Sequence, residues 1–162
     1  MYDAPIKCPP RAVEQAWIDY NGHMNMAYYV LVFDQCLDHV YDLLGIGEQY
    51  VQDHSASCFT REIQVNYLQE LTLGDPIRVE FQLLDWDAKR LHFIETMHHE
   101  REGYLAATAE QLALHVDMTS RRTAPFPDAV QLRLTDMMHA HARLAKPEQV
   151  GQHIGIRRTG AQ

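Results

Sequence analysis

Long apolar runs are the first thing that this sequence lacks. No stretch of about eighteen consecutive apolar residues occurs, so we expect no transmembrane helix, although 46% of the 162 residues are hydrophobic. The opening residues, MYDAPIKCPPR, contain no apolar core, and we therefore expect no signal peptide. Internal repeats and low-complexity segments are also missing. These absences indicate one globular domain over residues 1–162, with a core at about 11–118 and a C-terminal helix and tail at 125–162.

Positive charge is also scarce. The chain has 14 Lys and Arg against 22 Asp and Glu, for a formal net charge of −8 at pH 7. This excess of negative charge disfavours general binding to nucleic acid or to an anionic membrane, so we expect neither as a partner. A small anionic ligand stays compatible with the sequence, because a local basic cluster can outweigh the total charge.

Cysteine is rare and unpatterned. Cys8, Cys36 and Cys58 are an odd number of residues at irregular spacings, which predicts reduced thiols in a cytoplasmic protein. Histidines that lie close together have no third ligand at a zinc-finger spacing, and adjacent strand residues point to opposite faces of a sheet. These histidines are His98, His99, His139 and His141. We therefore predict no metal site and no cofactor.

The stretch Trp17–Phe33, WIDYNGHMNMAYYVLVF, organises the rest of the chain. It contains an Asn-Gly turn, and Asn25 is a good N-cap for a helix that begins at Met26. Apolar residues then recur at alternating steps of four and three, which predicts a helix face. They are Met26, Val30, Phe33, Leu37, Val40 and Leu44, and Tyr29, Leu31 and Tyr41 widen the face. We expect a helix to about Leu44, buried on most sides and ended at Gly45.

After the helix, the hydrophobic period changes to two, which predicts strands. The sequence favours a weak first strand at 12–18, a loop at 45–57 with a helical turn near 48–52, and a polar helix at 128–144. Four strands are predicted in succession at 59–67, 77–83, 90–99 and 105–116. One buried helix followed by antiparallel strands is an α+β pattern, in which a sheet wraps around the helix. Because such a sheet has open edges, we expect a second subunit to pair with one of them.

Asp19 and His23 stand four residues apart, just before the predicted helix. One interpretation is structural: an Asp that caps a turn and a His that fills it. The other is chemical, because the large neighbours Trp17, Ile18 and Tyr20 surround the carboxylate. The free N–H groups of the first helical turn can then hold a developing negative charge beside it. A base or nucleophile, an orienting group and an oxyanion site are the three parts that acyl transfer needs.

With these residues in view, the chain resembles hotdog-fold acyl-CoA thioesterases of the 4-hydroxybenzoyl-CoA thioesterase type. The segments that carry the resemblance are Asp19–Asn25 (DYNGHMN), which matches the family's Asp-x-x-Gly-His-x-Asn turn, then Ala27–Tyr29, Ile63–Tyr67, Leu73–Asp75 and Leu114–Asp117. The match is specific in the turn and general in the strands. It implies a long central helix wrapped by a roughly five-stranded antiparallel sheet, and a homodimer or homotetramer.

The resemblance also implies catalytic roles. Asp19 would attack the thioester carbon or activate water, and His23 would orient the reacting groups. The backbone N–H near Met26, at the helix start that Asn25 caps, would polarise the thioester carbonyl. The family often has a second Asn directly after this Asn, where this chain has Met26.

Substrate-binding residues follow from the same resemblance. Thr60 or Glu62 would supply a polar group from the partner chain, and Tyr28 would face the acyl pocket. Lys89-Arg90 with His92 would contact the phosphates of coenzyme A, although a solvated hairpin end explains the same cluster. Arg121-Arg122 is a second candidate for those phosphates. Coenzyme A enters as part of the acyl-CoA substrate, not as a cofactor.

Two other functions stay open. A hotdog enoyl-CoA hydratase also uses Asp, Asn and His near the helix, but its Asp and His are five apart with a proline between, whereas this chain has a spacing of four and a glycine. A non-catalytic acyl-CoA-binding module usually carries a basic DNA-binding segment, and none is visible here. The run from Trp17 to His23, together with Lys89–His92, is similar to thioesterases of carnitine and betaine breakdown. Their acyl groups carry a quaternary ammonium, which tyrosines and tryptophan can hold.

Overall fold

The central helix forms where the sequence predicts it. In the computed structural model, which describes residues 2–156, helix α1 spans Met26–Leu44. The side chain of Asn25 accepts a hydrogen bond from the Ala27 N–H at 3.0 Å and so caps the first turn. Gly45 ends the helix in the left-handed conformation, with φ of 72°. Both predicted ends are confirmed, while the predicted tail beyond residue 156 lies outside the described residues.

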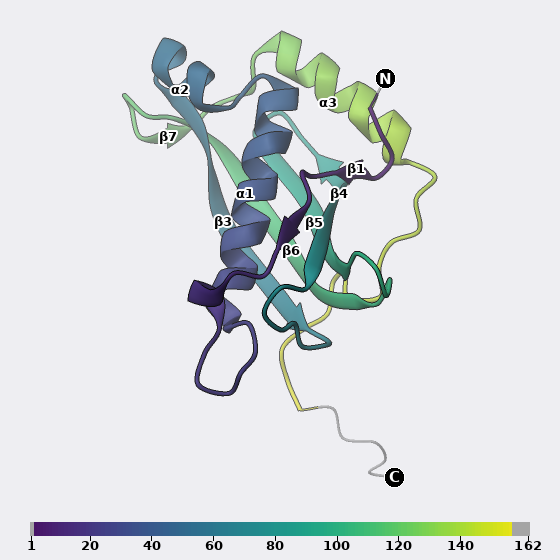
Figure 1. Cartoon of the computed structure of the whole chain (residues 1–162). Helices are drawn as coiled ribbons and strands as arrows, with labels where there is room; N and C mark the ends of the chain where they lie inside the picture. Colours follow the sequence, from purple (N-terminus) through teal and green to yellow (C-terminus); the bar gives the residue numbers. More distant parts are fainter. Residues whose placement is uncertain (1, 157–162) are drawn as a thin grey trace.

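An antiparallel sheet wraps around α1 (Figure 1). Its strands are β1 (Ile6–Lys7), β2 (Arg11–Ala12), β3 (Ala56–Tyr67), β4 (Pro76–Trp86), β5 (Arg90–His99), β6 (Leu105–Asp117) and β7 (Arg122–Thr123). The order is β1-β4-β5-β6-β3, with β2 also on β4 and β7 on β6. The four long strands are the four that the period of two predicts, and the α+β hotdog architecture is confirmed.

The core lies between α1 and the inner face of the sheet. Phe33 on α1, Phe81 on β4 and Phe93 on β5 are all fully buried there. On β6, Ala107, Ala109 and Ala113 are fully buried as well, because small side chains let the helix lie close to the strand.

The prediction that α1 is buried on most sides is wrong for this chain. Met26 is 64% exposed, and Leu31, Asp34 and Asp38 are exposed as well. One side of the helix therefore packs on the sheet and the other faces outward. Apolar residues that recur at steps of four and three indicate one face of a helix, but they do not show how wide the buried part of that face is.

The remaining segments differ partly from expectation. The predicted weak strand at 12–18 is wrong: it contains the end of β2 and a short 3-10 helix, Gln15–Trp17. Helix α2 spans Glu48–His54, where a helical turn was expected, and α3 spans Asp128–His141. The His141 imidazole ties α3 to the sheet by accepting a hydrogen bond from the Leu83 N–H at 2.9 Å. Within residues 2–156, no helix combines the length and hydropathy that a bilayer crossing requires.

The outer edge of β3, the last strand of the sheet, has no partner strand among the described residues (Figure 1). Phe59, Ile63 and Tyr67 on this strand, and Leu68 just after it, are each 39–48% exposed. A long strand edge with unpaired backbone groups and exposed apolar residues favours pairing with another strand.

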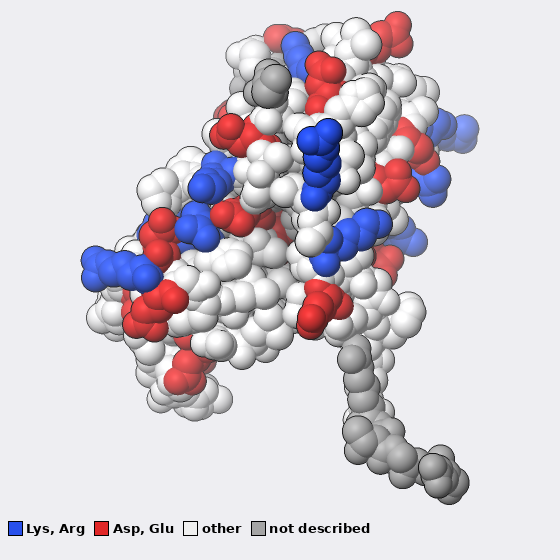
Figure 2. Space-filling view, turned by 90° about the vertical axis from the view of Figure 1, so that its right-hand side faces the viewer, with Lys and Arg blue, Asp and Glu red and all other residues white. Residues whose placement is uncertain are grey.

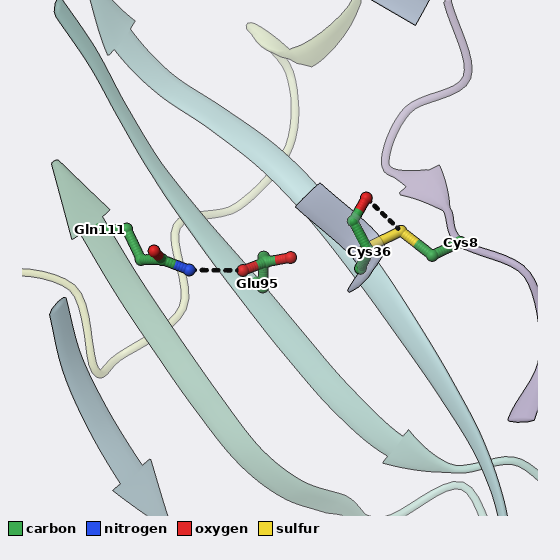
Figure 3. Close-up of a disulfide and its surroundings, with 4 residues drawn as sticks. All are labelled: Cys8, Cys36, Glu95 and Gln111. Atoms are coloured by element: carbon green, nitrogen blue, oxygen red, sulfur yellow. Dashed lines mark hydrogen bonds between the residues drawn. A yellow bond between two sulfur atoms is a disulfide. The ribbon is translucent and has the colours of Figure 1, made fainter. Parts of the chain in front are cut away.

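Two of the three cysteines form a disulfide, which contradicts the prediction of reduced thiols. Cys8 follows β1 and Cys36 lies on α1, with their Cα atoms 5.4 Å apart (Figure 3). The fold brings together two residues that are 28 apart in the sequence, and no spacing rule foresees that approach. Cys58 stays free. The disulfide therefore removes reduced thiols as an argument for a cytoplasmic location, and that location stays a prediction.

A buried carboxyl lies on the inner face of the sheet. Glu95 on β5 is fully buried, and its Oε2 accepts a hydrogen bond from the Gln111 side chain at 2.7 Å (Figure 3). Burial raises the pKa of Glu95 well above its usual value, against the lowering effect of the Gln111 hydrogen bond. Within the core, Glu95 is therefore a hydrogen-bonding partner of Gln111.

Candidate active site

Asp19 sits in a tight turn that its own atoms stabilise. The Asp19 N–H donates to the His23 carbonyl, and the Gly22 N–H donates to the Asp19 carbonyl, each at 3.0 Å. The Asp19 Oδ1 accepts the Asn21 N–H at 2.8 Å. Gly22 has φ of 83°, which glycine adopts without strain. The turn-capping interpretation is therefore correct for one oxygen, while Oδ2 has no hydrogen-bond donor among residues 2–156.

Backbone hydrogen bonds fix this turn against both the helix and the sheet. Ile18 and Met24 form an antiparallel bridge at the base of the turn. The Asn25 N–H donates to the Trp17 carbonyl, and the Met24 N–H donates to the Leu71 carbonyl, both at 2.8 Å. The Asp19 carboxylate is thus presented on a rigid turn directly before α1.

The first turn of α1 offers one N–H group that the protein does not use. The Ala27 N–H is bound by the Asn25 side chain, and the Tyr28 N–H donates to the Asn25 carbonyl at 3.0 Å. The Met26 N–H has no acceptor in the described part of the chain. The positive end of the helix dipole lies at this position. An available N–H at the helix start and an available carboxylate oxygen on the turn before it are two of the groups that thioester attack requires.

Aromatic side chains surround the helix start. Tyr28 stacks on the buried Trp17, with ring centroids 5.9 Å apart. The Tyr67 hydroxyl on β3 donates to the Met26 carbonyl at 3.1 Å, and its ring meets Tyr29 edge-on. Tyr20, by contrast, is 97% exposed, so the expectation that it surrounds the carboxylate is wrong for a single chain.

His23 contacts a residue that the sequence did not point to. Its Nε2 lies 3.3 Å from the Glu70 Oε2, in the connection between β3 and β4. Glu70 has no motif around it, and only the fold brings it to the imidazole. A carboxylate at this place can fix the ring orientation of His23.

The other predicted site residues lie at the opposite end of the sheet. The backbone N–H of Leu68, which follows β3 near the helix start, donates to the carbonyl of Ala106 on β6. Arg90 instead pairs with Leu114, farther along β6. The distance along β6 from Ala106 to Leu114 is about 26 Å. Within one chain, therefore, Asp19, His23, Asn25, Met26 and Tyr28 form one group, and Thr60, Lys89, Arg90 and His92 lie away from it.

Arg90 and His92 face a cavity of about 470 Å³ on the outer face of the sheet, which Glu62 and Trp86 also line. We call it the outer cavity. Both side chains have acidic partners: the Arg90 Nε donates to the Asp87 Oδ2 at 2.6 Å, and the His92 Nε2 lies 2.7 Å from the Glu110 Oε1. The Arg90 hydrogen bond lowers the pKa of Asp87. The expected basic spot is therefore partly neutralised, although Lys89 remains exposed.

Charges of both signs are also mixed on the face at the right of Figure 1. Figure 2 shows Lys and Arg interspersed there with Asp and Glu. A coenzyme A phosphate on this face would therefore contact individual cations and not a broad basic patch.

Thr60 faces a different cavity, of about 440 Å³, between α1, α2 and the first half of β3. We call it the acidic cavity, because its lining includes Asp34, Asp38, Asp42 and Glu48. Tyr41 and Cys58 also line it. Burial raises the pKa of the Cys58 thiol to about 12, so this cysteine is not a thiolate nucleophile at neutral pH.

The described residues contain no cluster of side chains that could hold a metal ion. Among residues 2–156, no three His, Cys, Asp or Glu side chains are placed to share one ion. The carboxylates of the acidic cavity are thus too dispersed for a metal centre.

Residues 13–134 match the thioesterase-like superfamily. Two curated relatives extend this match over most of the chain. A betainyl-CoA thioesterase from Pseudomonas aeruginosa is 38% identical over 140 residues, which are 86% of this chain and 88% of the relative. The chain belongs to the thioesterase-like superfamily. A Rhizobium meliloti L-carnitine dehydrogenase/betainyl-CoA thioesterase is 35% identical over 95% of this chain, but the chain spans only 31% of that relative.

A solved structure supports the same family. The Staphylococcus aureus protein solved in complex with CoA has a TM-score of 0.90 and 29% identity, with 97% of this chain and 98% of that chain covered. The likeness confirms the hotdog fold, and the family match confirms the predicted relationship to carnitine- and betaine-associated thioesterases.

Proposed function

We propose that this protein hydrolyses the thioester of an acyl-CoA whose acyl group carries a quaternary ammonium, as betainyl-CoA does. The observation that carries the proposal is the open Asp19 carboxylate oxygen on a fixed turn that leads into α1, whose Met26 N–H is unused among the described residues. The membership of the thioesterase-like superfamily supports the reaction type. The names of the relatives support the substrate class.

The reaction would use both groups. As a base, Asp19 takes a proton from water while the water oxygen adds to the thioester carbon. The carbonyl oxygen gains a negative charge, which the Met26 N–H and the helix dipole stabilise. The tetrahedral intermediate then collapses, and coenzyme A leaves as the thiolate. As a nucleophile, Asp19 would instead form an acyl anhydride that water hydrolyses. Either route requires an ionised Asp19 oxygen.

Assays on three outcomes test this function. With betainyl-CoA, we expect release of free thiol, detected with a thiol reagent, at a rate that saturates with substrate. With crotonyl-CoA, we expect no loss of the enoyl absorbance, because the spacing of Asp19 and His23 differs from that of the hydratases. Hydration of crotonyl-CoA without thiol release would identify a hydratase. A thermal shift with betainyl-CoA without turnover would identify a binding module.

A homodimer formed through the β3 edges is part of the proposal. A twofold axis across this edge would set the first residues of one β3 beside the last residues of the other. The Asp19 group of one copy would then approach Thr60 and the Arg90 end of the second copy. In this arrangement the two separated groups of predicted residues would form one site at each end of the interface.

Lys89 and Arg90 are proposed to contact the phosphates of coenzyme A. The double variant Lys89→Ala/Arg90→Ala should raise KM about tenfold, which corresponds to the loss of one charge-assisted hydrogen bond. Because these residues lie far from the thioester, kcat should change little. Arg143→Ala/Lys146→Ala removes the same charge from exposed positions elsewhere and should leave KM unchanged. If KM stays the same in the first variant, Arg121-Arg122 become the better candidates.

A further inference from the structure

The position of the ammonium in the proposed substrate limits where the protein can recognise it. In betainyl-CoA the charged nitrogen is two bonds from the thioester carbonyl carbon. If the Met26 N–H binds the carbonyl oxygen at about 3 Å, the charged nitrogen lies within about 7 Å of the Met26 nitrogen. Asp38 is twelve residues after Met26 on α1, a rise of about 18 Å, and is out of reach. The side chains that recognise the cation must therefore lie at the helix start.

Tyr67, at the end of β3, lies in this region. Its hydroxyl donates a hydrogen bond to the Met26 carbonyl at 3.1 Å, so the end of β3 is beside the start of α1 (Figure 1). The nitrogen and the carbonyl oxygen of one residue are three bonds apart, which places the Tyr67 hydroxyl oxygen within about 7 Å of the Met26 nitrogen. The ammonium and this tyrosine therefore share the region around Met26.

Tyr67 is the most exposed of the aromatic side chains that pack on the start of α1. Trp17 and Tyr29 are buried, with 5% and 4% of their surfaces exposed, so a ligand does not reach their rings. Tyr28 is half-buried and uses one ring face to stack on Trp17, with centroids 5.9 Å apart. Tyr67 is 44% exposed and has room for a ligand beside its ring.

Two contacts fix the orientation of the Tyr67 ring. One is the hydrogen bond to Met26, and the other is the Tyr29 ring, which meets the Tyr67 ring at 86° with centroids 5.2 Å apart. A perpendicular contact uses at most one face of each ring, so a face of Tyr67 stays open. A quaternary ammonium donates no hydrogen bond and is attracted through its methyl groups to such a face. Because the ring is already held in place, little side-chain entropy is lost on binding.

We propose that Tyr67 determines the preference for a quaternary ammonium, with its open ring face against the methyl groups while the Met26 N–H holds the thioester oxygen. The proposal rests on the proposed function and names the residue that selects its substrate.

Tyr67 serves the reacting centre of its own chain, because its hydroxyl bonds to the helix start of that chain. Side chains of a strand stand on the two faces of the sheet, and pairing through the edge of β3 uses backbone groups. The ring therefore stays on the α1 side of the sheet when two copies pair. The second copy would close the site from across the interface.

A matched pair of substrates tests this role. Betainyl-CoA and 3,3-dimethylbutyryl-CoA have the same shape, but a carbon replaces the charged nitrogen in the second. The wild-type protein should prefer betainyl-CoA in kcat/KM. Tyr67→Leu should lower kcat/KM for betainyl-CoA about tenfold, mainly through KM, because the attraction between the cation and the ring is lost. The value for the neutral substrate should change little. An equal fall for both substrates would give Tyr67 a structural role only and overturn the proposal, and so would no fall for either.

Ring electronics provide a second test that keeps the shape of the side chain. Tyr67→Phe loses the hydroxyl hydrogen bond but keeps the ring, so the preference for betainyl-CoA should persist. Fluorinated phenylalanines at position 67 withdraw negative charge from the ring face, and the preference should fall with each added fluorine. A preference that stays constant through the fluorinated series would overturn the contact between cation and ring.

The control is Tyr2→Leu, because the Tyr2 hydroxyl also donates to a carbonyl of α1, that of Leu43 at 3.3 Å, but at the opposite end of the helix. This variant should leave the preference unchanged. If the wild-type protein hydrolysed the neutral thioester but showed no preference for the cation, the Tyr67 proposal would fail and the thioesterase function would stand. If it hydrolysed neither thioester, the proposed function itself would fail.

Mixed dimers test whether Tyr67 acts within its own chain. Asp19→Asn and Tyr67→Leu are co-expressed with different affinity tags and purified through both tags. If each site takes Asp19 and Tyr67 from one copy, the mixed dimer has one site without the carboxylate and one without the ring. It should then show the weakened preference of Tyr67→Leu. If Tyr67 acts across the interface, one site of the mixed dimer is intact, and a wild-type preference would overturn the assignment to the same chain.

Discussion

Asp19→Asn should lower kcat for thioester hydrolysis by at least about a hundredfold, the loss expected when a catalytic base is removed. The substitution keeps the size of the side chain, and the amide oxygen can still accept the Asn21 N–H that Oδ1 accepts at 2.8 Å. The turn should therefore stay intact. Only the negative charge is lost, and both the base route and the nucleophile route need it. Stopped assays of free thiol at saturating acyl-CoA measure the effect.

Two further variants test whether the loss is specific to the charge of Asp19. Asp117→Asn makes the same chemical change at another turn, where Oδ1 accepts the N–H groups of Thr119 and Ser120 at 2.8 Å each, and it should leave kcat unchanged. His23→Ala should reduce kcat less than Asp19→Asn, because we assign His23 an orienting role. Binding of a non-hydrolysable acyl-CoA should survive in Asp19→Asn. Hydrolysis at nearly the wild-type rate in this variant would make Asp19 a turn cap only.

The sequence was most informative where one local rule determines the structure. The bounds of α1 follow from the Asn25 cap and the glycine at Gly45, and both are confirmed. The long strands follow from the period of two, and on β4, β5 and β6 one face of the strand is buried in the core. The Asp19 turn was also visible, since Asp, Asn and Gly have local turn preferences.

Features that depend on distant parts of the chain were not visible in the same way. The Cys8–Cys36 bond joins a segment after β1 to the middle of α1. The contact of His23 with Glu70 depends on how the connection between β3 and β4 passes the helix start. The division of the predicted site into two groups depends on the register of β6 with β3 and β5. No spacing within the sequence encodes these approaches.

The acidic cavity is predictable from the sequence only in part. Asp34, Asp38 and Tyr41 repeat at helical spacings, so the sequence does place them on one side of the helix. A row of acids on a helix is usually a solvated face, and the sequence alone does not show that α2 and β3 enclose it.

Ile63→Asp should separate the subunits and reduce thioesterase activity at both sites. Ile63 lies near the middle of β3, on the open edge, and 39% of its surface is exposed in the single chain. In a twofold interface each substitution occurs twice, so two carboxylates would face one another in a desolvated strand pair. Light scattering should show a lower mass at micromolar protein, and the hydrolysis rate should fall with it.

A matched substitution separates this effect from a general loss of stability. Leu132 on α3 is 68% exposed and lies away from β3, so Leu132→Asp should leave both mass and rate unchanged. Activity in Ile63→Asp should recover as the protein concentration rises, because mass action restores the dimer and each dimer restores two sites. An active monomer of Ile63→Asp would contradict the shared site, since one chain would then hold Asp19 and its acyl pocket together.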